Sequence, residues 1–207
     1  MQKAIIIDLD DTLINTHKRH YLVFSNFMAG HNAPVVTFED YLEKRKTQKL
    51  SNKQLVQTML PLQTAAFEQF WLENIESAAC LNADELLVDV TLLEAIRQKG
   101  VAVIVLSLRS NHTTAMQQVQ GLPISSLIDE FIFVKHAAGT NPKTGYLKAL
   151  TSKYHILAFI GDAATDMQAA EEAGINFYAV KTGLYPVTHK YTFTTINEAQ
   201  KAIIQHI

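Results

Sequence analysis

The chain has 207 residues, of which 48% are hydrophobic and 18% are charged, and its formal net charge is −2. This length and balance predict a folded protein with one substantial core and a smaller lobe, and they exclude a disordered chain. A general nucleic-acid-binding protein needs a strong basic excess, so we expect a small-molecule partner and no nucleic acid.

The single cysteine, Cys80, excludes an intramolecular disulfide and suits a reducing compartment. The first apolar strand begins near residue 4, which leaves no room for a signal peptide. No apolar run approaches the roughly 20 residues of a transmembrane helix. We therefore expect a cytoplasmic protein that does not enter membranes and that exists as a monomer or a homodimer.

The first predicted element is a strand at residues 4–7, whose unbroken apolar run is typical of a central parallel strand buried on both faces. Three carboxylates follow it at once, from Asp8, Asp10 and Asp11. Burial penalises each of these charges, so the cluster is costly unless a cation lies beside it. The alternative interpretation is an ordinary polar turn, in which Asp is common.

Residues 16–85 show helical periodicity, and Thr37 and Ser51 stand where N-caps are expected. The aromatic residues of this segment are more typical of a small helical core than of a cofactor site. We therefore predict a small all-helical domain at residues 16–85, inserted into a larger domain made of residues 1–15 and 86–207.

From residue 86 onward, apolar strands alternate with helices. Further strands are predicted at residues 101–106, 131–134, 156–160 and 177–180, with helices between and after them. This alternation predicts an α/β fold with a doubly wound, Rossmann-like parallel sheet.

Polar residues follow three of the predicted strands. Asp8 and Asp10 follow the first, Ser107 follows the second, and Asp162 and Asp166 follow the fourth. The carboxyl ends of parallel strands share one edge of the sheet, so these residues are expected to meet in one crevice. The two acidic groups would repel each other there. A hard divalent cation removes this repulsion, and Mg²⁺ suits a site made of oxygen ligands.

Cationic and hydroxyl side chains are predicted at the same edge. Lys143 follows Pro142 at the start of a helix, and with Ser107 it is placed to bind phosphate oxygens. Arg109 lies two residues beyond Ser107, and its guanidinium suits a forked contact with a substrate phosphate or carboxylate. The alternative for Arg109 is a surface arginine paired with a neighbouring carboxylate.

Four segments together resemble the motifs of the haloacid dehalogenase superfamily. The run Asp8-Leu9-Asp10-Asp11-Thr12 resembles the first motif, Ser107 the second, Lys143 the third, and residues 161–166 the fourth. The helical insert stands where subfamily I members carry a cap domain. Lys135 and Lys148 are rival candidates for the third motif.

The resemblance implies a magnesium-dependent phosphatase that hydrolyses a small phosphorylated metabolite. Asp8 would then be the nucleophile that forms an aspartyl-phosphate, and Asp10 the general acid and base. Ser107 and Lys143 would bind the transferring phosphoryl group. The implied magnesium site comprises Asp8, the main-chain carbonyl of Asp10, Asp162 and a supporting Asp166.

Other functions remain open at this stage. A phosphomutase of the same superfamily would share every catalytic residue, and a catalytically silent phosphate-binding or regulatory module would keep the fold. A response-regulator receiver fits less well, because a serine stands at the end of the second strand. His17 and His20, and the basic residues Lys44, Arg45, Lys46 and Lys49, are interpreted as surface groups of the insert.

Overall fold

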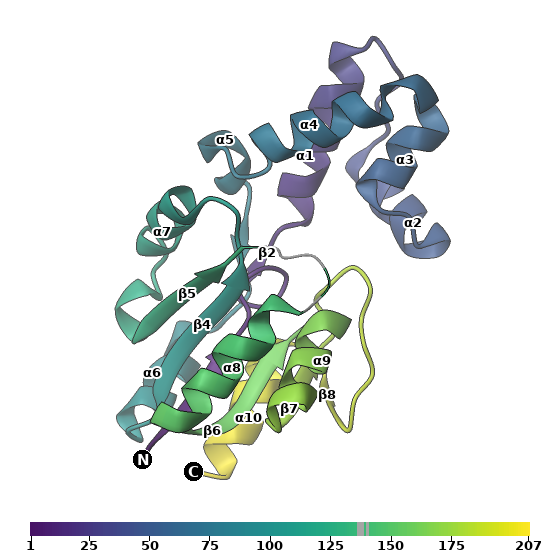
Figure 1. The fold of residues 1–207 in the computed structure, drawn as a ribbon. Helices are drawn as coiled ribbons and strands as arrows, with labels where there is room; N and C mark the ends of the chain where they lie inside the picture. Colours follow the sequence, from purple (N-terminus) through teal and green to yellow (C-terminus); the bar gives the residue numbers. More distant parts are fainter. Residues whose placement is uncertain (136–138, 140) are drawn as a thin grey trace. The chain divides into compact units, whose positions relative to one another are not determined.

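The computed structural model describes residues 1–135, 139 and 141–207. Its α/β part is a parallel six-stranded sheet with the strand order β5-β4-β1-β6-β7-β8 (Figure 1). The strands are β1 (Gln2–Ile7), β4 (Ala102–Leu108), β5 (Glu130–Val134), β6 (Tyr154–Gly161), β7 (Phe177–Val180) and β8 (Tyr191–Phe193). The predicted doubly wound α/β fold is confirmed, and the sheet has one more strand, β8, than the sequence predicts.

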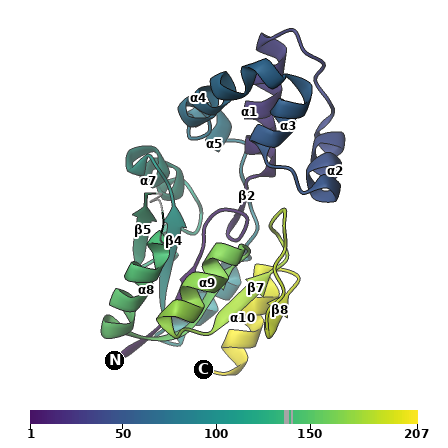
Figure 2. The same cartoon turned by 45° about the vertical axis from the view of Figure 1, so that its right-hand side comes forward.

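Helices cover both faces of this sheet. They are α6 (Val90–Gln98), α7 (His112–Gln120), the 3₁₀ helix η2 (Ser125–Leu127), α8 (Pro142–Lys153), α9 (Ala164–Ala173) and α10 (Ile196–Gln205). Ile5 and Ile7 of β1 belong to the core formed with α6, α7 and α10. Ala4 and Ile6 belong to the core formed with α8 and α9, which lie side by side on one face (Figure 2). Successive residues of a strand face opposite ways, so β1 is buried on both sides, as predicted.

The strand order reverses at β1. The chain builds β4 and β5 on one side of β1, and then β6, β7 and β8 on the other. Open α/β sheets bind ligands at the carboxyl ends of the strands where this reversal occurs. The carboxyl ends of β1, β4 and β6 are therefore the place to examine for a functional site.

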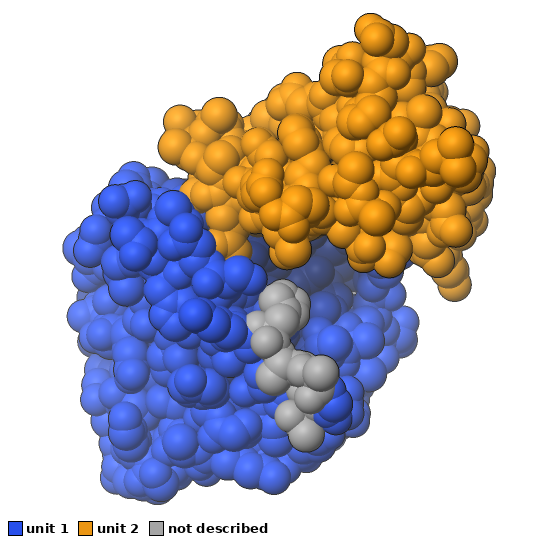
Figure 3. All heavy atoms as spheres, turned by 45° about the horizontal axis from the view of Figure 1, so that its top comes forward, with its two compact units in different colours: residues 1–15, 86–207 blue, residues 16–85 orange. Residues whose placement is uncertain are grey.

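Two compact units emerge from the contacts within the chain: residues 1–15 with 86–207, and residues 16–85 (Figure 3). The helices of the second unit are α1 (His17–Gly30), α2 (Phe38–Gln48), α3 (Asn52–Met59), the 3₁₀ helix η1 (Pro61–Gln63), α4 (Thr64–Asn74) and α5 (Ala78–Leu81). Two-residue strands, β2 (Ile14–Asn15) and β3 (Glu85–Leu86), pair with each other. Among the helices of the described residues, none combines the length and apolar character needed to cross a membrane.

The second unit has its own aromatic core, which includes Phe24, Tyr41 and Phe67. The predicted N-caps are confirmed: the side chain of Thr37 accepts the Asp40 N–H, and Ser51 forms a capping box with Gln54.

The interpretation of the basic run in α2 as a surface feature is wrong at one position. Arg45 is buried, and its Nη1 donates to the Tyr41 hydroxyl at 3.0 Å. That hydroxyl in turn donates to Asn52 Oδ1 at 2.6 Å. Arg45 therefore supports the core of the insert, while Lys46 and Lys49 are exposed.

Gln200 of α10 is fully buried, and its amide oxygen and nitrogen have no hydrogen-bond partner among the described residues. A buried unpaired amide costs about 1–3 kcal/mol. We therefore expect Gln200→Met, which keeps the side-chain length, to raise the Tm measured by circular dichroism. Gln205→Met on the exposed face of the same helix is the matched control and should leave Tm nearly unchanged. A lower Tm for Gln200→Met would contradict this account.

Candidate active site

The loop after β1 turns sharply and presents the first acidic cluster. The Asp8 N–H donates to the Ile160 carbonyl at 2.9 Å, so Asp8 is still held by the neighbouring strand β6. The next carbonyl, of Leu9, accepts the N–H groups of residues 12–14. Asp11 adopts a left-handed backbone conformation with φ of 55°, which Asp tolerates better than most residues. Asp8 and Asp10 therefore lie at the carboxyl end of β1.

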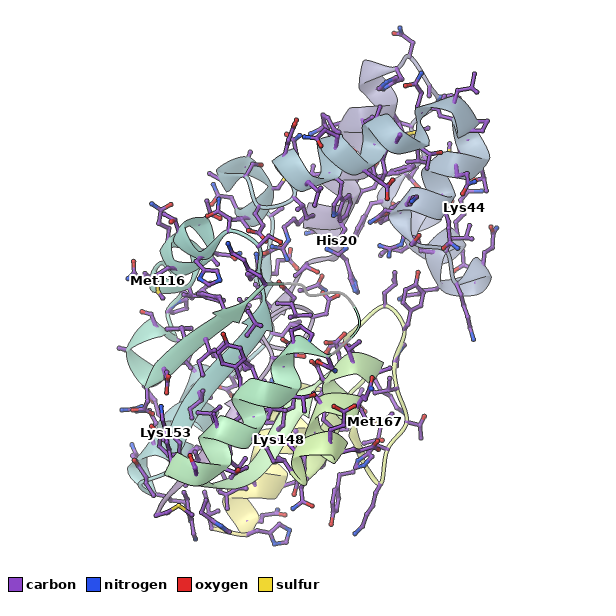
Figure 4. The ribbon with its side chains drawn as sticks, in the orientation of Figure 1. His20, Lys44, Met116, Lys148, Lys153 and Met167 are labelled. Atoms are coloured by element: carbon purple, nitrogen blue, oxygen red, sulfur yellow. The ribbon has the colours of Figure 1, made fainter. Side chains whose placement is uncertain are left out.

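Lys143 reaches this loop from the first turn of α8. The Asn141 side chain caps the helix by accepting the Lys143 N–H, and Pro142 occupies the first helical position. The Lys143 Nζ lies 2.6 Å from Asp8 Oδ1 and 2.6 Å from Asp166 Oδ1, and all three side chains are buried. The rival lysines are both exposed: Lys135 follows β5, and Lys148 lies on α8 (Figure 4). Lys143 is therefore the one of these three lysines that the structure joins to the acidic cluster.

Three carboxylates from distant segments converge here. Asp162 follows β6, and Asp166 lies in the first turn of α9. One carboxylate oxygen from each of Asp8, Asp162 and Asp166 lies within 4.8 Å of the other two. The predicted meeting of the acidic residues after β1 and β6 is thus seen in the structure. The carboxylate of Asp10 is not part of this group.

The acidic cluster is electrostatically strained. Burial raises the pKa of Asp8 to about 7, with Asp166 and Asp10 raising it further and Lys143 opposing them. Burial also raises the pKa of Asp162 well above its ordinary value, as do the charges of Asp8 and Asp166. Burial alone would lower the pKa of Lys143, but its two carboxylate partners outweigh this and raise it. One lysine charge therefore does not balance the site.

A divalent cation fits this donor set. Asp166 Oδ2 is buried and has no hydrogen-bond partner among the described residues, so one oxygen of this carboxyl group is left unsatisfied. Clustered carboxylate oxygens are the ligands that hard divalent cations prefer. The residues therefore form a candidate site for a divalent cation.

Two glycines let the chain approach these carboxylates closely. A Cβ added to Gly161 would lie 2.7 Å from Asp166 Oδ2, and one added to Gly183 would collide with the Asp162 carboxyl, 2.9 Å from its Cγ. Thr12 Oγ1 also donates to Asp162 Oδ1 at 3.2 Å. The adjacent Thr182 hydroxyl donates to the Asp11 carbonyl and ties the loop after β7 to the loop after β1. The sequence analysis missed Thr182, for which a hydroxyl and a glycine directly after a strand were the only signal.

Ser107 and Arg109 lie at the end of β4. Val105 is the β4 partner of Ile7, so Ser107, two residues further on, lies at the same edge as the loop after β1 and is buried. Arg109 is also buried, and its Nη2 donates to Asp10 Oδ1 at 2.7 Å. The edge of the sheet therefore carries every predicted site residue, with Arg109 joined to Asp10.

Comparison with known proteins agrees with this architecture. The family model of the haloacid dehalogenase-like hydrolases matches residues 2–174, and the chain belongs to this family. No curated protein matches the chain at a significant level.

Solved structures share the fold at low sequence identity. A subfamily IA hydrolase of the haloacid dehalogenase superfamily from Geobacter sulfurreducens is 16% identical, with a TM-score of 0.75 over 98% of this chain and 96% of that one. A protein from Haemophilus somnus described as a predicted phosphoglycolate phosphatase is 18% identical, with a TM-score of 0.67 over 98% of both chains. Protein tyrosine kinase A from Mycobacterium tuberculosis is 19% identical, with a TM-score of 0.71 over 98% of both. The fold alone therefore does not define the reaction.

The close approach of Gly183 to Asp162 generates a prediction. Gly183→Ala should displace the Asp162 carboxylate and weaken Mg²⁺ binding, measured by isothermal titration calorimetry, by about tenfold, as expected when a ligand's support is lost. Gly145→Ala, in an exposed position of α8 with no atom near the added methyl group, is the matched control. Equal affinity in the two variants would show that Asp162 does not need this space.

The raised pKa of Asp8 predicts how the metal-free protein responds to pH. The folded state holds the Asp8 proton up to about pH 7, whereas the unfolded state loses it near 3.8. This proton's contribution to stability is therefore lost as pH rises through 7. With a chelator present, we expect Asp8→Asn to lose less Tm than the wild type between pH 5.5 and 8, by about 4–8 °C. Parallel Tm profiles for the two proteins would contradict the assignment.

Proposed function

We propose that the protein is a magnesium-dependent phosphatase that hydrolyses a small phosphorylated metabolite through an aspartyl-phosphate on Asp8. The observation that carries this proposal is the position of Lys143 Nζ, 2.6 Å from both Asp8 and Asp166, beside Asp162. The proximity of a candidate nucleophile, a cation and carboxylates that could bind a metal supports the proposal. Phosphoryl transfer depends mainly on such positioning and on charge neutralisation.

In the first step of the proposed reaction, a carboxylate oxygen of Asp8 attacks phosphorus. The bond from phosphorus to the ester oxygen breaks, and Asp10 gives its proton to the departing oxygen. In the second step, Asp10 takes a proton from water as the water oxygen attacks the phosphorus of the acyl phosphate. The bond from phosphorus to Asp8 then breaks, which releases inorganic phosphate and restores the Asp8 carboxylate and the protonated Asp10.

The other residues would bind and neutralise the phosphoryl group. Lys143 supplies a buried positive charge beside Asp8, and Ser107 supplies a hydroxyl at the same edge. Mg²⁺ would be held by Asp8, Asp162 and the Asp10 carbonyl, with Asp166 in support. When bound, it would supply the positive charge that the strained carboxylates lack and polarise the phosphate oxygens.

The description of one structural neighbour supports a small substrate. The Haemophilus somnus protein is described as a predicted phosphatase of phosphoglycolate, a small phosphorylated carboxylate. A small phosphorylated metabolite therefore fits the proposal better than a phosphorylated protein. A phosphomutase would use the same residues but would not release free phosphate, so an inorganic phosphate assay separates the two reactions.

The main test is hydrolysis of p-nitrophenyl phosphate with and without Mg²⁺. We expect Mg²⁺-dependent release of phosphate by the wild type and a loss of at least about a thousandfold in Asp8→Asn, because an amide is a poor nucleophile and a weaker ligand. Asp89→Asn is the matched control. Asp89 is the N-cap of α6, where Asn serves equally well, so activity should be unchanged. Undiminished turnover in Asp8→Asn would sink the proposal.

We also infer that residues 16–85 act as a cap domain whose motion accompanies ligand binding. Only two connections, near residues 15 and 85, join this unit to the rest of the chain. Water exclusion favours phosphoryl transfer over side reactions. Hydrogen exchange of residues 16–85 in the wild type should slow when Mg²⁺ and inorganic phosphate are added together. The same additions should not slow the exchange in Asp8→Asn. Unchanged exchange in the wild type would contradict a moving cap.

A further inference from the structure

Arg109 is held in place by its surroundings on three elements. Its backbone N–H donates to the Val134 carbonyl of β5 at 3.0 Å, which extends the pairing of β4 with β5. Its Nη2 donates to Gln118 Oε1 of α7 at 3.1 Å and to Asp10 Oδ1 at 2.7 Å. The side chain is only 2% exposed. The guanidinium therefore has a fixed position from which it contacts Asp10.

Asp10 lies in a different environment from its partner. Its side chain is 28% exposed, and it belongs to the loop after β1 rather than to a strand or helix interior. Burial alone therefore does not fix the orientation of this side chain. The contact with a buried, fixed guanidinium constrains the carboxylate, because the charged hydrogen bond from Arg109 Nη2 to Asp10 Oδ1 is 2.7 Å long.

The remaining donors of Arg109 indicate that its role is functional. Nε and Nη1 are buried and have no hydrogen-bond partner among the described residues. Buried unsatisfied donors lower stability, so a purely structural arginine would be expected to satisfy them. Violations of this kind are typical of functional sites, where stability is given up for a required geometry.

We propose that Arg109 is a positioning residue that holds the Asp10 carboxylate at the site, and that it does not bind the substrate. This inference rests on the proposed function, in which Asp10 transfers protons. It differs from the substrate contact expected from the sequence, since the structure directs Nη2 to Asp10 and Gln118. Loss of Arg109 should then lower kcat, because Asp10 would no longer be held in position for proton transfer.

The test is a double-mutant cycle with Arg109→Met, Asp10→Asn and the double variant. Met fills similar space and removes the unsatisfied donors, so the variant is expected to fold. With glycerol 3-phosphate and Mg²⁺, Arg109→Met should lower kcat by about 10- to 100-fold and change KM by less than about threefold. The double variant should be no slower than Asp10→Asn alone, because Arg109 has nothing left to position.

Two further readouts separate positioning from a general structural effect. The loss in kcat should be smaller for p-nitrophenyl phosphate, whose leaving group needs little protonation. Arg109→Lys, which keeps the charge, should recover part of the loss. Arg97→Met is the matched control, because Arg97 also pairs with an aspartate, Asp129, in the same unit but remote from the site. The activity of this variant should be unchanged.

Several outcomes would overturn the inference. A KM for glycerol 3-phosphate raised tenfold or more with kcat retained would assign Arg109 to substrate binding. Losses that multiply in the double variant would show that Arg109 acts independently of Asp10. If the wild type hydrolyses no phosphate ester, the proposed function fails instead, and the coupling is measured by thermal unfolding. The Tm shifts of the two single variants should then be non-additive, and additive shifts would contradict the pairing.

Discussion

The structure depends on one electrostatic constraint: the carboxylates of Asp8, Asp162 and Asp166 converge beside a single buried lysine, Lys143. Burial and neighbouring charges raise the pKa of Asp8 and of Asp162, and Lys143 offsets this only in part at Asp8. The parallel sheet makes this arrangement possible, because it brings the carboxyl ends of β1 and β6 together and leaves the apolar side chains to form the two cores. The clustered carboxylates at the edge of the sheet thus lower the stability of the α/β unit, as is typical of sites that bind a cation.

Small residues surround the carboxylate cluster and hold its loops close together. Gly161 and Gly183 permit the backbone to pass close to the carboxylates, and Thr12 and Thr182 connect the loops that carry them. Arg109 adds a second cation, which donates to Asp10 of the loop after β1. Each cation therefore has its own carboxylate partners, and the two aspartates of the first motif are held in different environments.

Much of this arrangement was predictable because its signals are local. The buried strands are unbroken apolar runs, and the acidic residues follow them directly, so strand ends and the meeting of Asp8 with Asp162 follow from the topology of a parallel sheet. Strand β8 has only three, partly buried residues, which is too little for a periodic signal. The contacts of Lys143 with Asp8 and Asp166 and the pairing of Arg109 with Asp10 depend on side-chain geometry between distant segments, which no local pattern encodes.

The central position of β1 has a consequence for synthesis on the ribosome. Its neighbours in the sheet, β4 and β6, begin at Ala102 and Tyr154, so this central strand emerges long before either partner exists. The helical residues 16–85 form contacts that are local in sequence, and local contacts form fastest. The insert is therefore able to fold while β1 is still unpaired. During that interval the nascent chain exposes β1 with its hydrogen-bonding edges unpaired, and such a strand promotes aggregation. The solubility of the nascent chain therefore depends on early chaperone contact and on the rate at which residues 86–161 are translated.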